Sequence, residues 1–183
     1  MKNCLLLIDL QNDYFPGGAM ELVNIVPAAA NAGILLDRFR KAGLPVIHVQ
    51  HIAVQPGATF FLPGTPGAGF FPLLNPHPAE TVIVKHFPNS FRNTPLLQTL
   101  RDAGIDNLTV CGAMSHMCLD ATTRAAFDLG FTCIVVDDAC ATRDLEHRGT
   151  VVPANQVHAA FMAALSRPYA RVVATDDALP SAV

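Results

Sequence analysis

Three residues that could cooperate in nucleophilic catalysis stand far apart in the chain: Asp9, Lys85 and Cys118. A cysteine thiol can attack a carbonyl carbon, a carboxylate can take the thiol proton, and a lysine ammonium can balance the developing charge. Asp9 and Lys85 end the apolar runs CLLLID and TVIVK, and Cys118 follows the run NLTVCG. In an open parallel sheet, ligands bind beyond the carboxyl ends of the strands. We therefore predict that the three side chains meet at one edge of a sheet.

Each of the three residues also has a purely structural interpretation. Asp9 could cap a turn, Lys85 could be a solvated residue at a strand end, and Cys118 could be a small buried hydrophobic residue, the usual role of a free cysteine. Their combination favours the catalytic interpretation, because each of the three residues is placed at the same sheet edge for an independent reason.

The segment GAMSHMCLDAT places Cys118 where a strand is expected to give way to a helix. Ser115 is predicted to be the helix N-cap, which would put Cys118 at the third helical position. The helix dipole and a nearby lysine would favour thiolate there. Unpaired N–H groups around residues 113–118 could bind an oxyanion. The other cysteines are expected to be structural: Cys4, Cys111, Cys133 and Cys140.

Short apolar runs alternate with amphipathic stretches along the chain. Strands are predicted at 4–9, 45–50, 81–85, 107–112, 131–137 and 170–174, and helices at 27–42, 93–103, 116–129 and 148–166. Continuous apolar strands separated by helices indicate parallel strands that are covered on both faces. We therefore predict a single α/β domain over 1–183, with three layers, α/β/α.

The segment 52–79 has no clear period and is rich in Pro, Gly and Phe. A loop of this length within a compact domain is usually functional, so we expect it to line the active site or an interface. Its phenylalanines (Phe60, Phe61, Phe70 and Phe71) could line an apolar pocket or pack the loop against the domain.

Composition narrows the classes of partner. The chain has 183 residues, 51% hydrophobic and 15% charged, with a net charge of -3. There is no basic stretch for nucleic acid or an anionic membrane, and no apolar run reaches the ~20 residues of a membrane helix. Five cysteines without metal or disulfide spacing favour reduced thiols. We expect a cytoplasmic protein that acts on a small molecule.

An ordered series of motifs resembles the isochorismatase-like cysteine hydrolases, which include nicotinamidases and carbamoyl amidohydrolases. The series runs LLLIDLQNDYF, FLPGTPGAGF, VIVKHFPNSF, LTVCGAMSHMCLDATTRAAFDLGF and IVVDDACAT. The resemblance implies a Rossmann-like sheet of six parallel strands in the order 3-2-1-4-5-6. Strands lie ~4.8 Å apart, so Lys85 would have to reach across the second strand to meet Asp9 and Cys118.

The resemblance also implies roles for individual residues. Asp9 would be the general base and acid, Lys85 would stabilise charge, and Cys118 would be the nucleophile. The N–H groups of Met114 and Cys118 would form the oxyanion hole, next to a cis peptide between Ala113 and Met114. The predicted substrate-binding residues are Gln11, Phe15, His51, Phe60, Phe61 and His116.

Departures from the family pattern narrow the function. Nicotinamidases carry a metal-binding Asp-x-His pair after the second strand, whereas this chain has His48 and His51 and no aspartate there. On a strand these two histidines would face opposite sides, so we expect no metal and no cofactor. His51 and His116 could contact substrate or be structural. Isochorismatases proper cleave a vinyl ether and lack the cysteine, so Cys118 favours acyl transfer.

We therefore predict a hydrolase that cleaves a C–N bond of a small amide, carbamoyl or ureido compound through a thioester on Cys118. Alternatives are an isochorismatase-type hydrolase of another small substrate and a non-catalytic thiol sensor on the same fold. A nucleotide-binding domain is disfavoured, because DLQNDYF follows the first strand where G-x-G-x-x-G is required. Family members are commonly homo-oligomers, so at least a dimer is expected.

Overall fold

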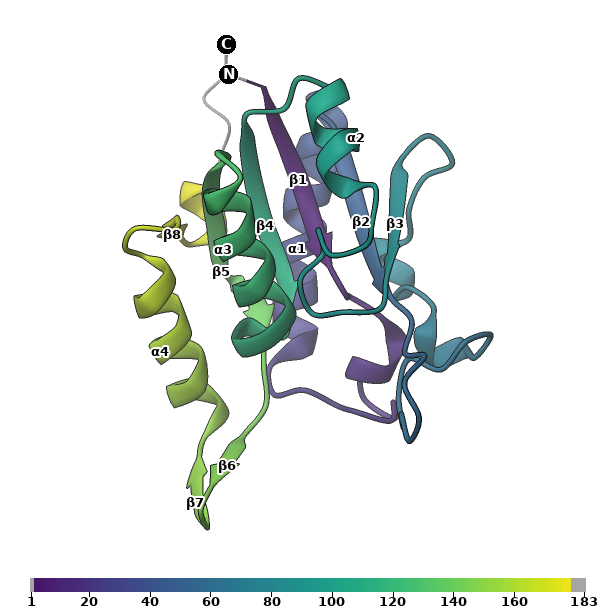
Figure 1. Ribbon diagram of the computed structural model, residues 1–183, viewed down its shortest axis with the longest axis vertical. Coiled ribbons are helices and arrows are strands. Elements are labelled where there is room, and N and C mark those ends of the chain that lie inside the picture. Colours follow the sequence, from purple (N-terminus) through teal and green to yellow (C-terminus); the bar gives the residue numbers. More distant parts are fainter. Residues whose placement is uncertain (1, 179–183) are drawn as a thin grey trace.

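The computed structural model describes residues 2–178 and has a central sheet of six parallel strands (Figure 1). The predicted strand order is confirmed, and in the numbering of the structure it reads β3-β2-β1-β4-β5-β8. The strands are β1 (Asn3–Ile8), β2 (Val46–His51), β3 (Thr81–Lys85), β4 (Asn107–Ala113), β5 (Thr132–Ala141) and β8 (Arg171–Val173).

Helices cover both faces of this sheet, as predicted for a three-layer fold. Helix α1 lies behind the sheet in Figure 1, and α2 and α3 lie in front. The helices are α1 (Ile25–Lys41), α2 (Leu96–Asp102), α3 (Asp120–Asp128) and α4 (Ala154–Leu165). Strand β1 is buried from Cys4 to Ile8, as expected of a central parallel strand, whereas Val82 and Val84 of the edge strand β3 are exposed.

The predicted helix 148–166 is wrong at its start. A hairpin of β6 (Leu145–His147) and β7 (Thr150–Val152) precedes α4 and projects from the body of the protein at the bottom of Figure 1. Its two turn residues, Arg148 and Gly149, both have positive φ angles, 51° and 79°, as a type I′ hairpin turn requires. Pro153 then stands at the N-cap of α4.

The segment 52–79 is attached to the chain that follows β1. Gln11 forms a β-bridge with Phe70, the Asn12 side chain donates to the Pro66 carbonyl, and the Asp13 carboxylate accepts the N–H of Phe61. Two short 3₁₀ turns, Pro66–Ala68 and Pro72–Leu74, lie within it. The loop is therefore held in place along residues 10–13.

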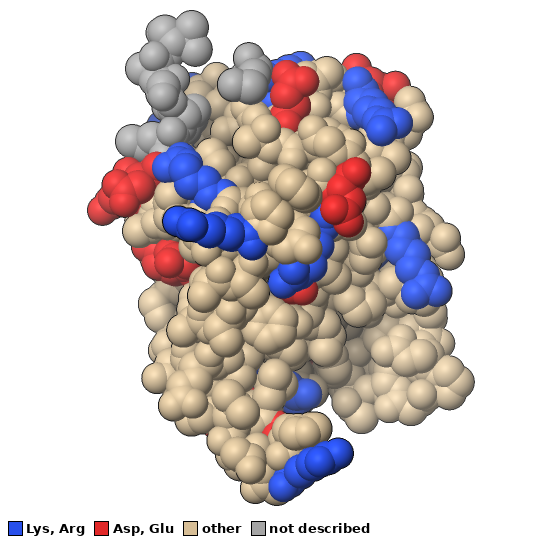
Figure 2. Space-filling model, turned by 60° about the vertical axis from the view of Figure 1, so that its left-hand side comes forward, with Lys and Arg blue, Asp and Glu red and all other residues tan. Residues whose placement is uncertain are grey.

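The surface shows two features that bear on partners. Basic and acidic side chains are interspersed on the face in Figure 2, which shows no concentrated basic patch of the kind that nucleic acids favour. Within residues 2–178, no helix combines the length and the apolar character needed to cross a membrane.

Candidate active site

Asp9 is the first residue beyond β1, and its side chain is fully buried. Its φ angle is 53°, a left-handed conformation that aspartate tolerates better than most residues. Gly112 on β4 pairs with Ile8, and a Cβ at Gly112 would collide with the Ile8 carbonyl. The close approach of β1 and β4 therefore brings Asp9 next to the turn that follows β4.

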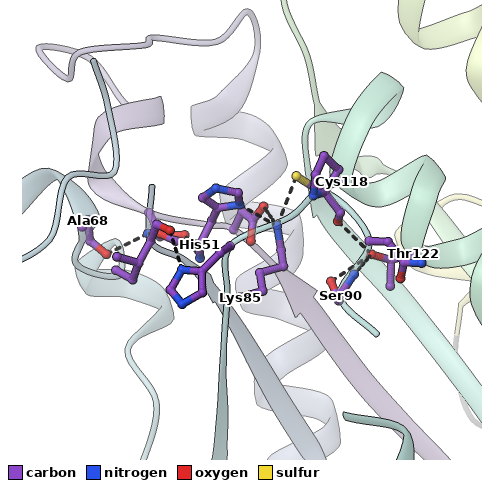
Figure 3. Close-up of polar contacts among 12 residues, drawn as sticks. His51, Ala68, Lys85, Ser90, Cys118 and Thr122 are labelled. Atoms are coloured by element: carbon purple, nitrogen blue, oxygen red, sulfur yellow. Dashed lines mark hydrogen bonds and ion pairs between the residues drawn. The ribbon is translucent and has the colours of Figure 1, made fainter. Parts of the chain in front are cut away.

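Lys85 is the last residue of β3 and is also fully buried. As predicted, its side chain crosses β2 to reach the centre of the sheet edge. Its Nζ lies 2.7 Å from Oδ2 of Asp9 and 3.2 Å from Sγ of Cys118 (Figure 3). The structure thus brings Asp9, Lys85 and Cys118 together.

Cys118 lies within a π-helical turn, Ser115–Leu119, that precedes α3. The Leu119 N–H donates to the Met114 carbonyl five residues back, so the turn is wider than an α-helical one. Ser115 is not the N-cap that the sequence suggested, since its hydroxyl donates to the Ala141 carbonyl and the N-cap is Met114. The peptide bond between Ala113 and Met114 is cis.

The expectation that the helix dipole and Lys85 favour the thiolate form of Cys118 is wrong. Burial raises the pKa of the Cys118 thiol well above its ordinary value, and the Asp9 carboxylate raises it further; Lys85 offsets this only in part. Burial opposes the charge on Lys85, but the pKa of Lys85 is raised, chiefly by the Asp9 carboxylate. The resting pair is therefore a protonated thiol beside a charged ammonium.

His51 completes the surroundings of Lys85. Its Nδ1 lies 2.9 Å from Lys85 Nζ, and burial together with the Lys85 charge lowers the pKa of His51 to about 4. The imidazole is therefore neutral near pH 7. Gln11 holds the backbone of His51 on both sides: Oε1 accepts its N–H at 2.7 Å, and Nε2 donates to its carbonyl at 2.9 Å.

A metal ion does not fit this site as the side chains stand. Three possible ligand atoms lie within 4.8 Å of one another, one from each of Asp9, His51 and Cys118. A transition metal could use this donor set. The Lys85 ammonium, however, contacts all three side chains, so a metal would have to displace a buried positive charge. His48 is separate from this site and bonds to Glu80 at 2.9 Å.

A pocket of about 290 Å³ leads to Cys118. Its walls are mainly aromatic or apolar, with two histidines and one glutamine: Tyr14, His51, Gln55, Phe60, His86, Phe87, Pro88, Met117 and Cys118. Lys85, buried behind these residues, is not among them. A small uncharged molecule would match this lining, because most of the polar groups in the lining carry no fixed charge.

The predicted substrate-binding residues occupy different positions. His51 and Phe60 line the pocket. Phe61 is buried against Tyr14, with ring centroids 4.5 Å apart, and Phe15 stacks on Phe71 at 3.7 Å. Gln11 is buried beneath His51. The His116 ring bonds to Thr142 through Nδ1 and lies outside the pocket lining.

Several lining residues were not singled out in the sequence. Tyr14 follows Asp13 in the first motif, and His86 and Phe87 directly follow Lys85. Their closeness to two candidate catalytic residues was the available signal. His86 is fixed by a bond between Nδ1 and the Ile52 carbonyl at 2.8 Å, a contact between distant segments that spacing does not reveal.

Comparison with known proteins relates this chain to one family. The sequence pattern of the isochorismatase domain matches residues 3–177. The uncharacterized isochorismatase family protein YddQ of Bacillus subtilis (strain 168) is 53% identical over 96% of this chain and 98% of its own length. An isochorismatase-type hydrolase from Oleispira antarctica has a structure with a TM-score of 0.93 and 52% identity, over 96% of this chain and 95% of that one. Maleamate amidohydrolase of Pseudomonas putida (strain KT2440) is 27% identical over 97% of this chain and 85% of its own.

Proposed function

The chain belongs to the isochorismatase family of hydrolases, and from that premise we propose that it cleaves a C–N bond of a small amide, carbamoyl or ureido compound. Cys118 is the proposed nucleophile, Asp9 the general base and acid, and Lys85 the residue that balances charge. The amidohydrolase named among its relatives supports this reaction class.

The observation that carries the proposal is the placement of the Lys85 ammonium between Asp9 and Cys118, at 2.7 and 3.2 Å. A buried thiol with a raised pKa needs a base at the moment of attack. The second carboxylate oxygen, Asp9 Oδ1, has no hydrogen-bond partner among the described residues, so it is available to take the thiol proton.

The proposed reaction proceeds in two halves. Asp9 takes the proton as Sγ attacks the carbonyl carbon, and the oxyanion is held by the N–H groups of Met114 and Cys118. The C–N bond then breaks, ammonia or an amine leaves with the proton from Asp9, and a thioester remains. In the second half Asp9 takes a proton from water and the hydroxide attacks the thioester carbonyl carbon. The C–S bond then breaks, the acid product leaves, and the proton returns from Asp9 to the sulfur.

The pocket supports an uncharged substrate with an apolar or planar portion. Aromatic rings form much of its wall, including Phe60 and Phe87. The Lys85 ammonium is already engaged by three side chains, so it offers no free hydrogen bond to a substrate carboxylate. We also expect a homo-oligomer, as is common in the family.

The test is ammonia release from a panel of small amides, ureido acids and nicotinamide. Wild type is compared with Cys118→Ala, and with Cys140→Ala as a matched loss of a buried thiol that does not line this pocket. Release that survives a chelator and Cys140→Ala but disappears in Cys118→Ala supports the proposal, and quenched wild type should carry the acyl group on the Cys118 peptide. Release that persists in Cys118→Ala, or that a chelator abolishes, contradicts it.

A further inference from the structure

The Lys85 ammonium has three N–H bonds and three acceptors. They are Oδ2 of Asp9 at 2.7 Å, Nδ1 of His51 at 2.9 Å and Sγ of Cys118 at 3.2 Å. The nitrogen is buried, and a buried ammonium hydrogen without an acceptor is costly. These three bonds therefore determine the direction in which the ammonium points, and the imidazole supplies the acceptor on the side of β2.

The structure also fixes the protonation of the ring. An ammonium can only donate, so Nδ1 of His51 must accept and the ring hydrogen must be on Nε2. The charged or titratable groups near this imidazole are Lys85 and His86 from the segment at the end of β3, Asp9 after β1, and Cys118 in the π turn. The nearest positive charge, Lys85, opposes protonation of the ring.

The position of the ring is itself constrained. His51 pairs with Lys85 in the register of β2 and β3, which sets the two side chains next to each other. The Gln11 amide holds the backbone N–H and carbonyl of His51 and also donates to the Ala68 carbonyl at 2.8 Å. The imidazole therefore has little freedom to move away from the ammonium.

We infer that His51 is a positioning residue, whose neutral imidazole accepts the third hydrogen bond of Lys85 and so keeps the ammonium in contact with Asp9 and Cys118. Without this acceptor, one ammonium hydrogen has no partner and Lys85 turns toward pocket water. The bond to Cys118 is the longest of the three and is lost first. The effect of this contact on turnover rests on the proposed function, but its effect on the reactivity of the Cys118 thiol does not.

The experiment compares His51→Asn, His51→Gln and His51→Leu. An Asn side chain places an amide oxygen close to the position of Nδ1, whereas a Gln side chain places its polar group near the position of Nε2. The measurement is the rate at which iodoacetamide alkylates Cys118 as a function of pH, followed by peptide mass mapping. This probe needs no substrate, and thermal unfolding of each variant establishes that it is folded.

We expect His51→Leu and His51→Gln to slow alkylation at neutral pH by roughly 10- to 100-fold, the range for loss of a hydrogen bond to a charged group, and to move the pH profile upward. His51→Asn should stay within a few-fold of wild type. Equal rates in His51→Leu and wild type would overturn the inference, as would rescue by Gln but not by Asn. Because alkylation is independent of turnover, failure of the amide panel alone would count against the proposed function and leave this result intact.

Discussion

The Lys85 ammonium lies 3.2 Å from Sγ of Cys118, although β2 and β1 separate the strand of Lys85 from the strand that precedes Cys118. The Lys85 side chain crosses the carboxyl end of β2 only; Asp9, just after β1, and Cys118, in the turn after β4, contact its ammonium from the other side. The same side chain bonds to Asp9 at the end of β1. The buried ion pair therefore joins three parts of the sheet edge, and it should affect stability as well as activity.

Lys85→Met should destabilise the protein by about 3 kcal/mol, because it leaves the buried Asp9 carboxylate without a cation. Asp9→Asn alone leaves the buried ammonium without its counter-charge. The double variant removes both charges, so its loss in free energy of unfolding should be smaller than the sum of the two single losses. Urea denaturation at pH 7 of all four proteins measures this coupling. Strictly additive losses would show that the pair does not interact.

Asp9→Asn should speed the alkylation of Cys118 but slow the turnover of the enzyme. Burial and the Asp9 carboxylate both raise the pKa of the thiol, so neutralising Asp9 should lower that pKa and speed alkylation by iodoacetamide at pH 7. Ammonia release should nevertheless fall, by roughly 100-fold or more, because no base or acid remains for the two proton transfers. If alkylation slows together with turnover, Asp9 has a mainly structural role.

The strands were predictable because their apolar runs are continuous: β1 is buried from Cys4 to Ile8, and the edge strand β3 has the run TVIVK although Val82 and Val84 are exposed. The closeness of Asp9, Lys85 and Cys118 followed from the positions at which those runs end. The π turn at Cys118 did not follow, since it depends on a backbone bond from Leu119 to Met114 that spans five residues. The raised pKa of Cys118 also depends on burial, which spacing does not encode. The pocket wall could not be predicted either, because Tyr14, His86 and Phe60 come from three separate segments.

Phe60 and Phe61 are adjacent in sequence but should have separate effects. Phe61 is fully buried against Tyr14 and Phe60, so Phe61→Ala should reduce the free energy of unfolding by about 3–5 kcal/mol. Phe60 lines the pocket, so Phe60→Ala should raise KM for an active amide several-fold with a smaller loss of stability. Thermal unfolding and steady-state kinetics separate the two. A KM for Phe60→Ala equal to that of wild type would remove Phe60 from the substrate-binding surface.

Glu80 should make stability depend on pH in the acidic range. Burial alone would raise the pKa of Glu80, but hydrogen bonds from Arg40, the His77 N–H and His48 outweigh it and lower the pKa to about 2. A lowered carboxyl pKa stabilises the fold above the unfolded value of about 4.5, and the stabilisation is lost as pH falls toward 2.

Glu80→Gln should therefore cost about 1–2 kcal/mol at pH 7, in line with hydrogen bonds to a charged group, and this difference from wild type should shrink between about pH 4.5 and 2. Urea denaturation across that range measures it. Asp37→Asn is the matched control, because the Asp37–Lys41 ion pair is 58% and 75% exposed and exposed pairs contribute little. A Glu80→Gln difference that stays constant from pH 7 to pH 3 would mean that the charge of Glu80 is not what stabilises this end of the sheet.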